Sequence, residues 1–292
     1  NGLRYKKVPD YSVDFVFTTQ RGDLLKKYKG KKIHLCYGVG LTTYSFSESR
    51  ESIDKFDLKI VHGDISYDAV KERKPSIELI KAGYLRYSRW RGVPKYIYGS
   101  EEKKSIIKTN NSLNKPVLLY FPTWGKASSI DMYAKEIQEL KKEYFIITKA
   151  HHCTYRLESE RKHREIIDEI SDVVLEGNFS FENAAQLGNI AICDAISGAA
   201  TEVPFLRKNI KLVLLFSPMS VKNQYKTFIN RYACIVKEKD GLSKAVAQVY
   251  YEDSFIAERV RLIDKLYSPD MERALSDIKK YIFENTDKSK RR

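Results

Sequence analysis

Short apolar runs of strand length alternate with helix-length segments along most of this chain of 292 residues. The runs lie at 13–19, 32–37, 56–62, 116–121, 144–149, 172–175, 190–193 and 212–216. Strands separated by helices do not pair as hairpins but form parallel sheets with right-handed crossovers. The alternation therefore predicts an α/β protein with two doubly wound, Rossmann-like domains that face each other across a cleft.

The segment from Ser100 to Lys115 is polar and lacks strong periodicity, which is typical of a linker. We therefore expect an N-terminal domain at 1–110 and a C-terminal domain at 111–292 that includes the C-terminal helices. Because residue 1 is Asn rather than Met, we expect the first domain to be truncated at its N-terminus. Near the end of this domain the pattern predicts short helices at 66–74 and 75–81.

The net charge of +14 indicates an anionic partner, such as a phosphorylated substrate, an anionic lipid surface or a nucleic acid, unless it reflects composition bias alone. The four cysteines are single, without C-x-x-C spacing, so they encode neither a zinc site nor a disulfide framework. This favours a reducing, cytosolic setting. No apolar run approaches the roughly 20 residues that span a bilayer.

Polar residues follow three of the predicted strands of the second domain. In an open parallel sheet, ligands bind outside the carboxyl ends of the strands, so we expect these residues to form a ligand site. They are Thr123 and Trp124 after the run 116–121, Lys149 and His151 at and after the end of 144–149, and Asp194, Ser197 and Gly198 after 190–193.

The turn DAISGAATEV, which begins at Asp194, carries the strongest phosphate signal. Its small residues let the backbone approach a ligand, and the N–H groups that begin the next helix, with the Ser197 hydroxyl, suit a pyrophosphate. The alternative is that the small residues only permit tight packing and that Ser197 is an ordinary cap. His151 can bind phosphate or move a proton, or it can be a structural group at a strand end. His151 and the adjacent His152 diverge, so we expect no metal site.

The runs PVLLYFPTWGKASS, ITKAHH and DAISGAATEV resemble, in order and spacing, motifs of the CDP-glycerol glycerophosphotransferase family. This family contains teichoic acid and capsule polyol-phosphate transferases of the glycosyltransferase B fold. The resemblance covers about 100 residues and implies that the seven residues above bind a nucleotide-activated donor. It also implies that His151 neutralises the donor phosphates and that no cofactor takes part.

The sequence departs from the family in its first domain, where the family's W-H-G turn reads Cys36, Tyr37 and Gly38. That change removes the histidine expected to activate the acceptor. His62 and His34 lie at or near first-domain strand ends and are candidates for the missing base, although either can be structural. We name His62 and His151 as the candidate catalytic residues.

The cluster from Arg86 to Arg91 interleaves basic and aromatic residues. It suits nucleic acid through stacking and phosphate contact, but no nucleic-acid motif accompanies it. Arg86, Arg89 and Arg91 are therefore predicted to bind a lipid-linked acceptor or a membrane surface, with a solvated linker as the alternative.

The resemblance implies a transferase that moves a polyol phosphate from a CDP-activated donor to a cell-surface glycopolymer or a lipid-linked acceptor. The alternative enzyme is a nucleotide-sugar glycosyltransferase of the same fold with a CDP- or UDP-linked donor. A basic binding module without activity is the non-enzyme hypothesis. For either transferase we expect a cytoplasmic protein that is peripheral to the inner face of the plasma membrane.

Overall fold

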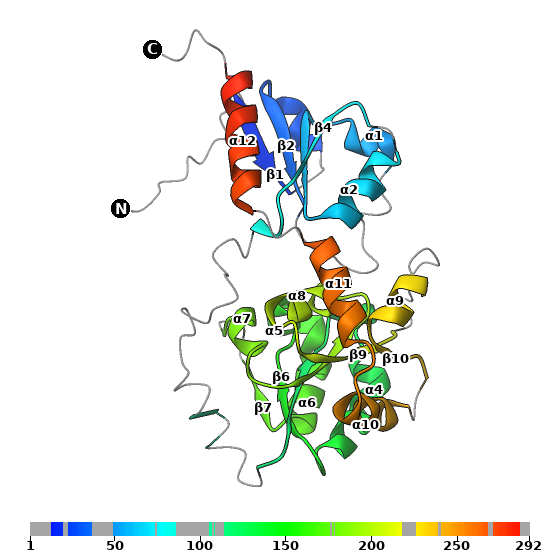
Figure 1. Cartoon of the computed structure of the whole chain (residues 1–292). Coiled ribbons are helices and arrows are strands. Elements are labelled where there is room, and N and C mark those ends of the chain that lie inside the picture. The colour runs from blue at the N-terminus through cyan, green and yellow to red at the C-terminus, as the bar shows by residue number, and fades with distance from the viewer. Residues whose placement is uncertain are drawn as a thin grey trace. The chain divides into compact units, whose positions relative to one another are not determined.

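The computed structural model describes residues 13–19, 23–36, 49–73, 75–85, 105–106, 108, 114–175, 177, 179–217, 226–238, 241–267 and 271–286. These residues form two compact units, each with its own parallel sheet (Figure 1). Unit 1 contains the described residues up to Leu85 and those from Asp264 onward, and unit 2 contains the described residues from 105 to Ile263. The two predicted α/β sheets are thus present.

Unit 1 has a four-stranded parallel sheet in the order β1-β2-β3-β4. Its elements are β1 (Phe15–Thr18), η1 (Asp23–Lys27), β2 (Lys31–Leu35), α1 (Arg50–Ile53), β3 (Leu58–Val61), α2 (Asp64–Lys71), β4 (Glu78–Lys81) and α12 (Met271–Asn285). The strands predicted at 13–19, 32–37 and 56–62 correspond to β1, β2 and β3.

The short helix predicted at 75–81 is wrong, because Glu78–Lys81 forms β4 and pairs in parallel with β3. Ile80 lies opposite Ile60 in this register, and both side chains are buried. Pairing with β3 satisfies the backbone groups on one side of this segment and buries Ile80, which a lone helical turn would not do. Tertiary pairing therefore overrides the local pattern.

The C-terminal helix α12 packs on the sheet of unit 1, beside its strands in Figure 1. Ile278 and Tyr281 join a buried cluster with Ile33 and Leu58, while α1 and α2 cover the other face of the sheet. A parallel sheet is apolar on both faces, so each face needs helices. The expectation that all of 111–292 belongs to the second domain therefore differs from the structure, which groups the residues from Asp264 onward with unit 1.

Unit 2 has a six-stranded parallel sheet in the order β10-β9-β8-β5-β6-β7. Its elements up to the end of the third strand are β5 (Val117–Phe121), η4 (Gly125–Ala127), α4 (Ile130–Leu140), β6 (Phe145–Thr148), α5 (His152–Arg156), η5 (Glu158–Glu160), α6 (Arg161–Ile170) and β7 (Val173–Val174). The remaining elements are α7 (Phe181–Ala184), β8 (Ile190–Asp194), α8 (Ala199–Leu206), β9 (Lys211–Leu215), α9 (Lys226–Tyr232), β10 (Cys234–Val236), α10 (Leu242–Tyr251) and α11 (Ile256–Leu266), whose last residues are grouped with unit 1.

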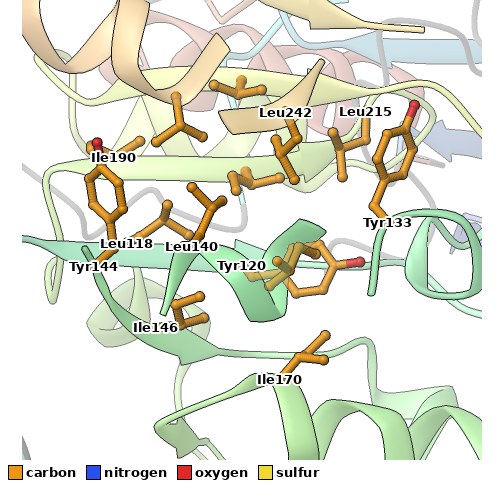
Figure 2. Packing of buried hydrophobic residues seen from close by; sticks show 14 of the residues in the cluster. Leu118, Tyr120, Tyr133, Leu140, Tyr144, Ile146, Ile170, Ile190, Leu215 and Leu242 are labelled. Atoms are coloured by element: carbon orange, nitrogen blue, oxygen red, sulfur yellow. The ribbon is translucent and has the colours of Figure 1, made fainter. Parts of the chain in front are cut away.

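The core of unit 2 lies between the sheet and the helices α4, α6 and α10. Figure 2 shows Leu118, Ile146 and Ile190 of the strands packed with Tyr133 and Leu242 of the helices. Burial of these side chains stabilises the unit by roughly 2 kcal/mol each. The resulting rigid sheet fixes where each strand ends. Among the described residues, no helix is both long and apolar enough to cross a membrane.

Candidate functional site

Three turns of unit 2 begin at the carboxyl ends of β8, β5 and β6, which are neighbours in the sheet and all parallel. Carboxyl ends of adjacent parallel strands share one edge, so the turns meet there. The sequence-predicted residues Thr123 and Trp124 follow β5, Lys149 and His151 follow β6, and Asp194, Ser197 and Gly198 end or follow β8. The structure thus brings these seven residues to one edge.

Asp194 is fully buried and connects two of the three turns. Its Oδ2 accepts hydrogen bonds from the backbone nitrogens of Thr123, at 2.7 Å, and Ser129, at 3.3 Å. Its Oδ1 has no partner among the described residues. Burial raises the pKa of this carboxyl group to about 6, although these hydrogen bonds oppose the rise. Asp194 therefore holds the turn after β5 rather than facing a ligand.

The same turn is held a second time at Gly125, whose φ of 61° lies in the left-handed region that favours glycine. The Gly125 backbone nitrogen donates to Oε2 of Glu160 at 3.1 Å, and Nδ1 of His163 lies 2.9 Å from the same oxygen. His163 Nε2 lies 3.0 Å from Oδ2 of Asp131. Glu160 is only 4% exposed, so its carboxylate depends on these partners.

Trp124 lies between the two held residues and is 41% exposed. Its ring stacks near that of His151, with 6.0 Å between the ring centroids. An exposed tryptophan beside a strand end offers a flat apolar surface to a ligand. Trp124 is exposed and His151 is half-buried, so both rings can be reached from solvent.

His151 caps the short helix α5, because its Nδ1 accepts a hydrogen bond from the Cys153 backbone nitrogen at 3.2 Å. Burial and the neighbouring His152 lower its pKa to about 4, so the ring is neutral at pH 7. With Nδ1 as the acceptor, the proton sits on Nε2. His151 therefore offers a neutral N–H donor, and the expectation that it neutralises phosphate by its own charge is not met in the ligand-free protein.

Lys149 supplies the positive charge at this edge. Its side chain is almost buried, and its Nζ lies 6.0 Å from the centroid of the Tyr155 ring. Burial lowers the pKa of the Lys149 ammonium group. A cation that has lost part of its hydration interacts more strongly with an incoming anion.

The turn after β8 pairs several backbone N–H groups with its own acceptors. Ser197 Oγ accepts from the Ala199 nitrogen at 3.2 Å, Ser197 O accepts from Ala200, and Gly198 O accepts from Glu202. The N–H groups of Ala199 and Ala200 are therefore already paired within the turn. Binding of a pyrophosphate at Ser197 and Gly198 stays a prediction. A Cβ added at Gly198 would lie 3.2 Å from Oε1 of Glu202, so the turn leaves little space for a side chain.

One group of metal-ligand side chains occurs among the described residues, made of His151, His152 and Cys153. Their ligand atoms lie within 4.8 Å of one another. In a tetrahedral zinc site the ligand atoms are roughly 3.4 Å apart. These three residues would have to move closer together to hold an ion, and His151 Nδ1 already accepts from Cys153.

His62 lies in unit 1, directly after β3, and is buried. Its Nδ1 donates to the Gly83 carbonyl at 3.2 Å, while its Nε2 has no partner among the described residues. Burial lowers its pKa to about 4, so Nε2 carries a free lone pair at neutral pH. His62 lines a pocket of about 190 Å³ with Thr19, Cys36 and Tyr84.

The sequence also indicates His34 as a candidate base and three arginines as an acceptor or membrane contact in the first domain. His34 is engaged in the interior, where its Nδ1 lies 2.8 Å from Nζ of the buried Lys59. Arg86, Arg89 and Arg91 lie outside the described residues.

The sequence reasoning missed Glu160 and His163, which hold the turn at Gly125. Both fall in the segment 158–170, whose sequence predicts a helix and in which no site residue was named. The available signal was the spacing of a glutamate and a histidine three residues apart, which places them on one helix face.

No family model and no curated protein matches this sequence. Among solved structures, the chain is similar to the wall teichoic acid polymerase TagF soaked with CDPG, at a TM-score of 0.58 and 15% identity, over 93% of this chain and 73% of that one. The chain is also similar to MnaA of S. aureus, solved with UDP, at a TM-score of 0.57 and 15% identity, over 87% of this chain and 70% of that one. For an α,α-trehalose-phosphate synthase (UDP-forming) from Burkholderia vietnamiensis the TM-score is 0.56 and the identity 8%, over 95% of this chain and 72% of that one. These similarities confirm the predicted two-sheet fold of the glycosyltransferase B type.

Proposed function

We propose that this protein is a transferase that takes a polyol phosphate, of the glycerol-phosphate kind, from a CDP-activated donor. The acceptor is a hydroxyl group of a cell-surface glycopolymer or of a lipid-linked precursor. The observation that carries the proposal is the meeting of the three turns at the carboxyl edge of β8, β5 and β6, where His151 offers an N–H donor. Two proteins of similar fold were solved with CDPG or UDP, which supports a nucleotide-linked donor.

Each residue at this edge has a proposed task. His151 Nε2–H donates to a phosphate oxygen of the donor, and the Lys149 ammonium group stabilises its negative charge. The exposed ring of Trp124 contacts the apolar part of the donor. Catalysis then rests on positioning and on stabilising charge, for which no metal or organic cofactor is needed.

In the proposed reaction the acceptor oxygen forms a bond to the β-phosphorus of the donor. The bond from that phosphorus to the bridging oxygen breaks, and CMP leaves with the electron pair. The proton of the acceptor hydroxyl goes to a base, for which we propose Nε2 of His62. This atom has no hydrogen-bond partner among the described residues and is unprotonated at neutral pH, and the His62 side chain lines a pocket of about 190 Å³.

A nucleotide-sugar glycosyltransferase is the second candidate. The UDP bound in the MnaA structure and the Tyr37 that replaces the family's histidine favour it. The two reactions differ in their leaving groups, because glycosyl transfer releases the nucleoside diphosphate whereas polyol-phosphate transfer releases the monophosphate. Identification of the released nucleotide separates them.

A panel of CDP, UDP, GDP, CDP-glycerol and UDP-linked sugars in thermal-shift binding tests the donor site. A ligand that binds only the folded state raises the melting temperature with its concentration. We expect CDP and CDP-glycerol to give the largest rise, and the rise to shrink in the His151→Ala variant. If none of the nucleotides raises the melting temperature, the donor-site proposal fails.

We further propose that the protein acts at the cytoplasmic face of the plasma membrane, where it associates peripherally. The net charge of +14 supports attraction to an anionic leaflet. A lipid-linked acceptor would require such an association.

A further inference from the structure

His163 lies between two carboxylates, and each of its ring nitrogens contacts one of them. Nδ1 is 2.9 Å from Oε2 of Glu160, and Nε2 is 3.0 Å from Oδ2 of Asp131. A carboxylate only accepts, so both ring nitrogens donate when His163 carries a proton on each. The protonated ring therefore joins η5 and α6 to the start of α4.

Glu160 connects His163 to the turn after β5. Its Oε2, which contacts His163, is also the acceptor for the Gly125 backbone nitrogen at 3.1 Å. A Cβ built at Gly125 meets no atom within 4 Å, so side-chain packing does not fix this residue. At the other end of the turn, Asp194 holds the Thr123 nitrogen. The exposed Trp124 is thus set by two buried carboxylates.

We propose that His163 is a positioning residue for this turn. As an imidazolium it donates a charge-assisted hydrogen bond to Glu160 and keeps that carboxylate aimed at Gly125. It thereby fixes the Trp124 ring against His151. This inference rests on the proposed function only in so far as the turn contacts the donor.

The charges around His163 favour its protonated form. Burial opposes the charge, but the hydrogen bonds to Glu160 and Asp131 outweigh burial and raise the pKa of His163 above its ordinary value near 6.5. The exposed Lys162 pairs with Asp131 at 3.0 Å. The charge of His163 also opposes, without cancelling, the rise that burial causes in the pKa of Asp194. The stabilisation that the His163 imidazolium gives to the folded turn is complete below pH 6.5. It is lost as the pH rises through the raised pKa of His163.

Fluorescence of Trp124 tests this arrangement without any substrate. The other tryptophan, Trp90, is replaced by Phe, and acrylamide quenching of Trp124 is measured from pH 6 to pH 9. We expect quenching to increase with pH when His163 is present, and to be high and independent of pH in His163→Gln. Lys162→Met and His152→Asn are matched controls that should retain the pH-dependent step, because both leave the contacts of His163 with Glu160 and Asp131 in place.

A His163→Gln protein that shows the same step, or a parent protein without one, would overturn the proposal. Melting curves of both proteins verify that the variant is folded, and His163→Asn provides a second neutral replacement. In a separate arm, His163→Gln should raise the dissociation constant of CDP roughly tenfold, through loss of one charge-assisted hydrogen bond. In turnover the donor KM should rise while kcat changes little. If the parent protein does not bind CDP, the proposed function fails, but the fluorescence result still decides the role of His163.

Discussion

The Asp194 carboxylate and the Thr123 backbone nitrogen are 71 residues apart in the sequence and 2.7 Å apart in the structure. This hydrogen bond fastens the end of β8 to the turn after β5. The bond from Gly125 to Glu160 fastens the same turn to the start of α6. The candidate donor site is therefore a turn held at both ends by buried carboxylates, with Trp124 presented between them.

Asp194 makes the stability of the protein dependent on pH. Its pKa is about 6 in the folded protein against an ordinary value of 3.8, so the folded state binds the proton more tightly than the unfolded state. The contribution of protonated Asp194 to the free energy of unfolding is therefore largest below pH 3.8 and is lost as the pH rises through 6. Between pH 5 and pH 7.5, the free energy of unfolding should fall by about 1 kcal/mol in wild type relative to Asp194→Asn. Urea unfolding of both proteins at the two pH values measures this, and an unchanged or opposite difference would contradict it.

The meeting of the three turns at one edge of unit 2 could be predicted because strand ends are visible in the sequence. Thr123, His151 and Asp194 follow apolar runs, and parallel pairing brings such ends together. The roles of these residues could not be predicted, since they depend on burial. Asp194 is buried and binds the backbone nitrogen of Thr123. His151 is neutral because burial lowers its pKa.

The remaining differences arise where distant segments decide the outcome. Residues 78–81 form a strand because β3 lies beside them, and α12 joins unit 1 because the sheet needs a cover on that face. Glu160 and His163 become a site component only through contact with Gly125 and Asp131. The partners in these contacts lie far apart in the sequence, so a local pattern cannot identify them.

Replacement of His151 by Ala should lower turnover by roughly a hundredfold, the usual loss for a positioned donor to a developing charge. His151→Gln retains an N–H donor and should recover part of this loss. The pKa near 4 means that His151 does not change protonation between pH 6 and pH 8, so its effect should be constant over that range. Initial rates at several pH values measure this. His152→Ala is the neighbouring control and should remain near wild type, whereas wild-type turnover in His151→Ala would make His151 a structural cap only.

His62 should behave as a base that acts on the acceptor and not on the donor. His62→Gln should lower kcat roughly a hundredfold while the donor KM stays nearly constant. Because burial lowers the pKa of His62 to about 4, the acid limb of the pH profile should lie near pH 4 and not near 6.5. Steady-state rates over a range of donor concentrations give kcat and the donor KM, and their repetition at several pH values gives the pH profile. A kcat close to wild type in the variant would remove His62 from the mechanism.

Membrane association should be electrostatic and reversible. The chain carries an excess of 14 positive charges, and each basic residue near an anionic leaflet contributes about 1 kcal/mol. Replacement of Arg86, Arg89 and Arg91 by Gln should therefore weaken binding to anionic vesicles by roughly a hundredfold if all three contact the surface. Sedimentation with vesicles measures this, and we expect association with anionic lipid at low salt, loss of association at high salt and none with neutral lipid. Removal of the basic segment 288–292 (KSKRR) is the matched control. Its effect on vesicle binding is compared with the effect of replacing the three arginines. If wild-type protein stays in the supernatant with anionic vesicles at low salt, the membrane proposal fails and the charge must serve the donor or acceptor instead.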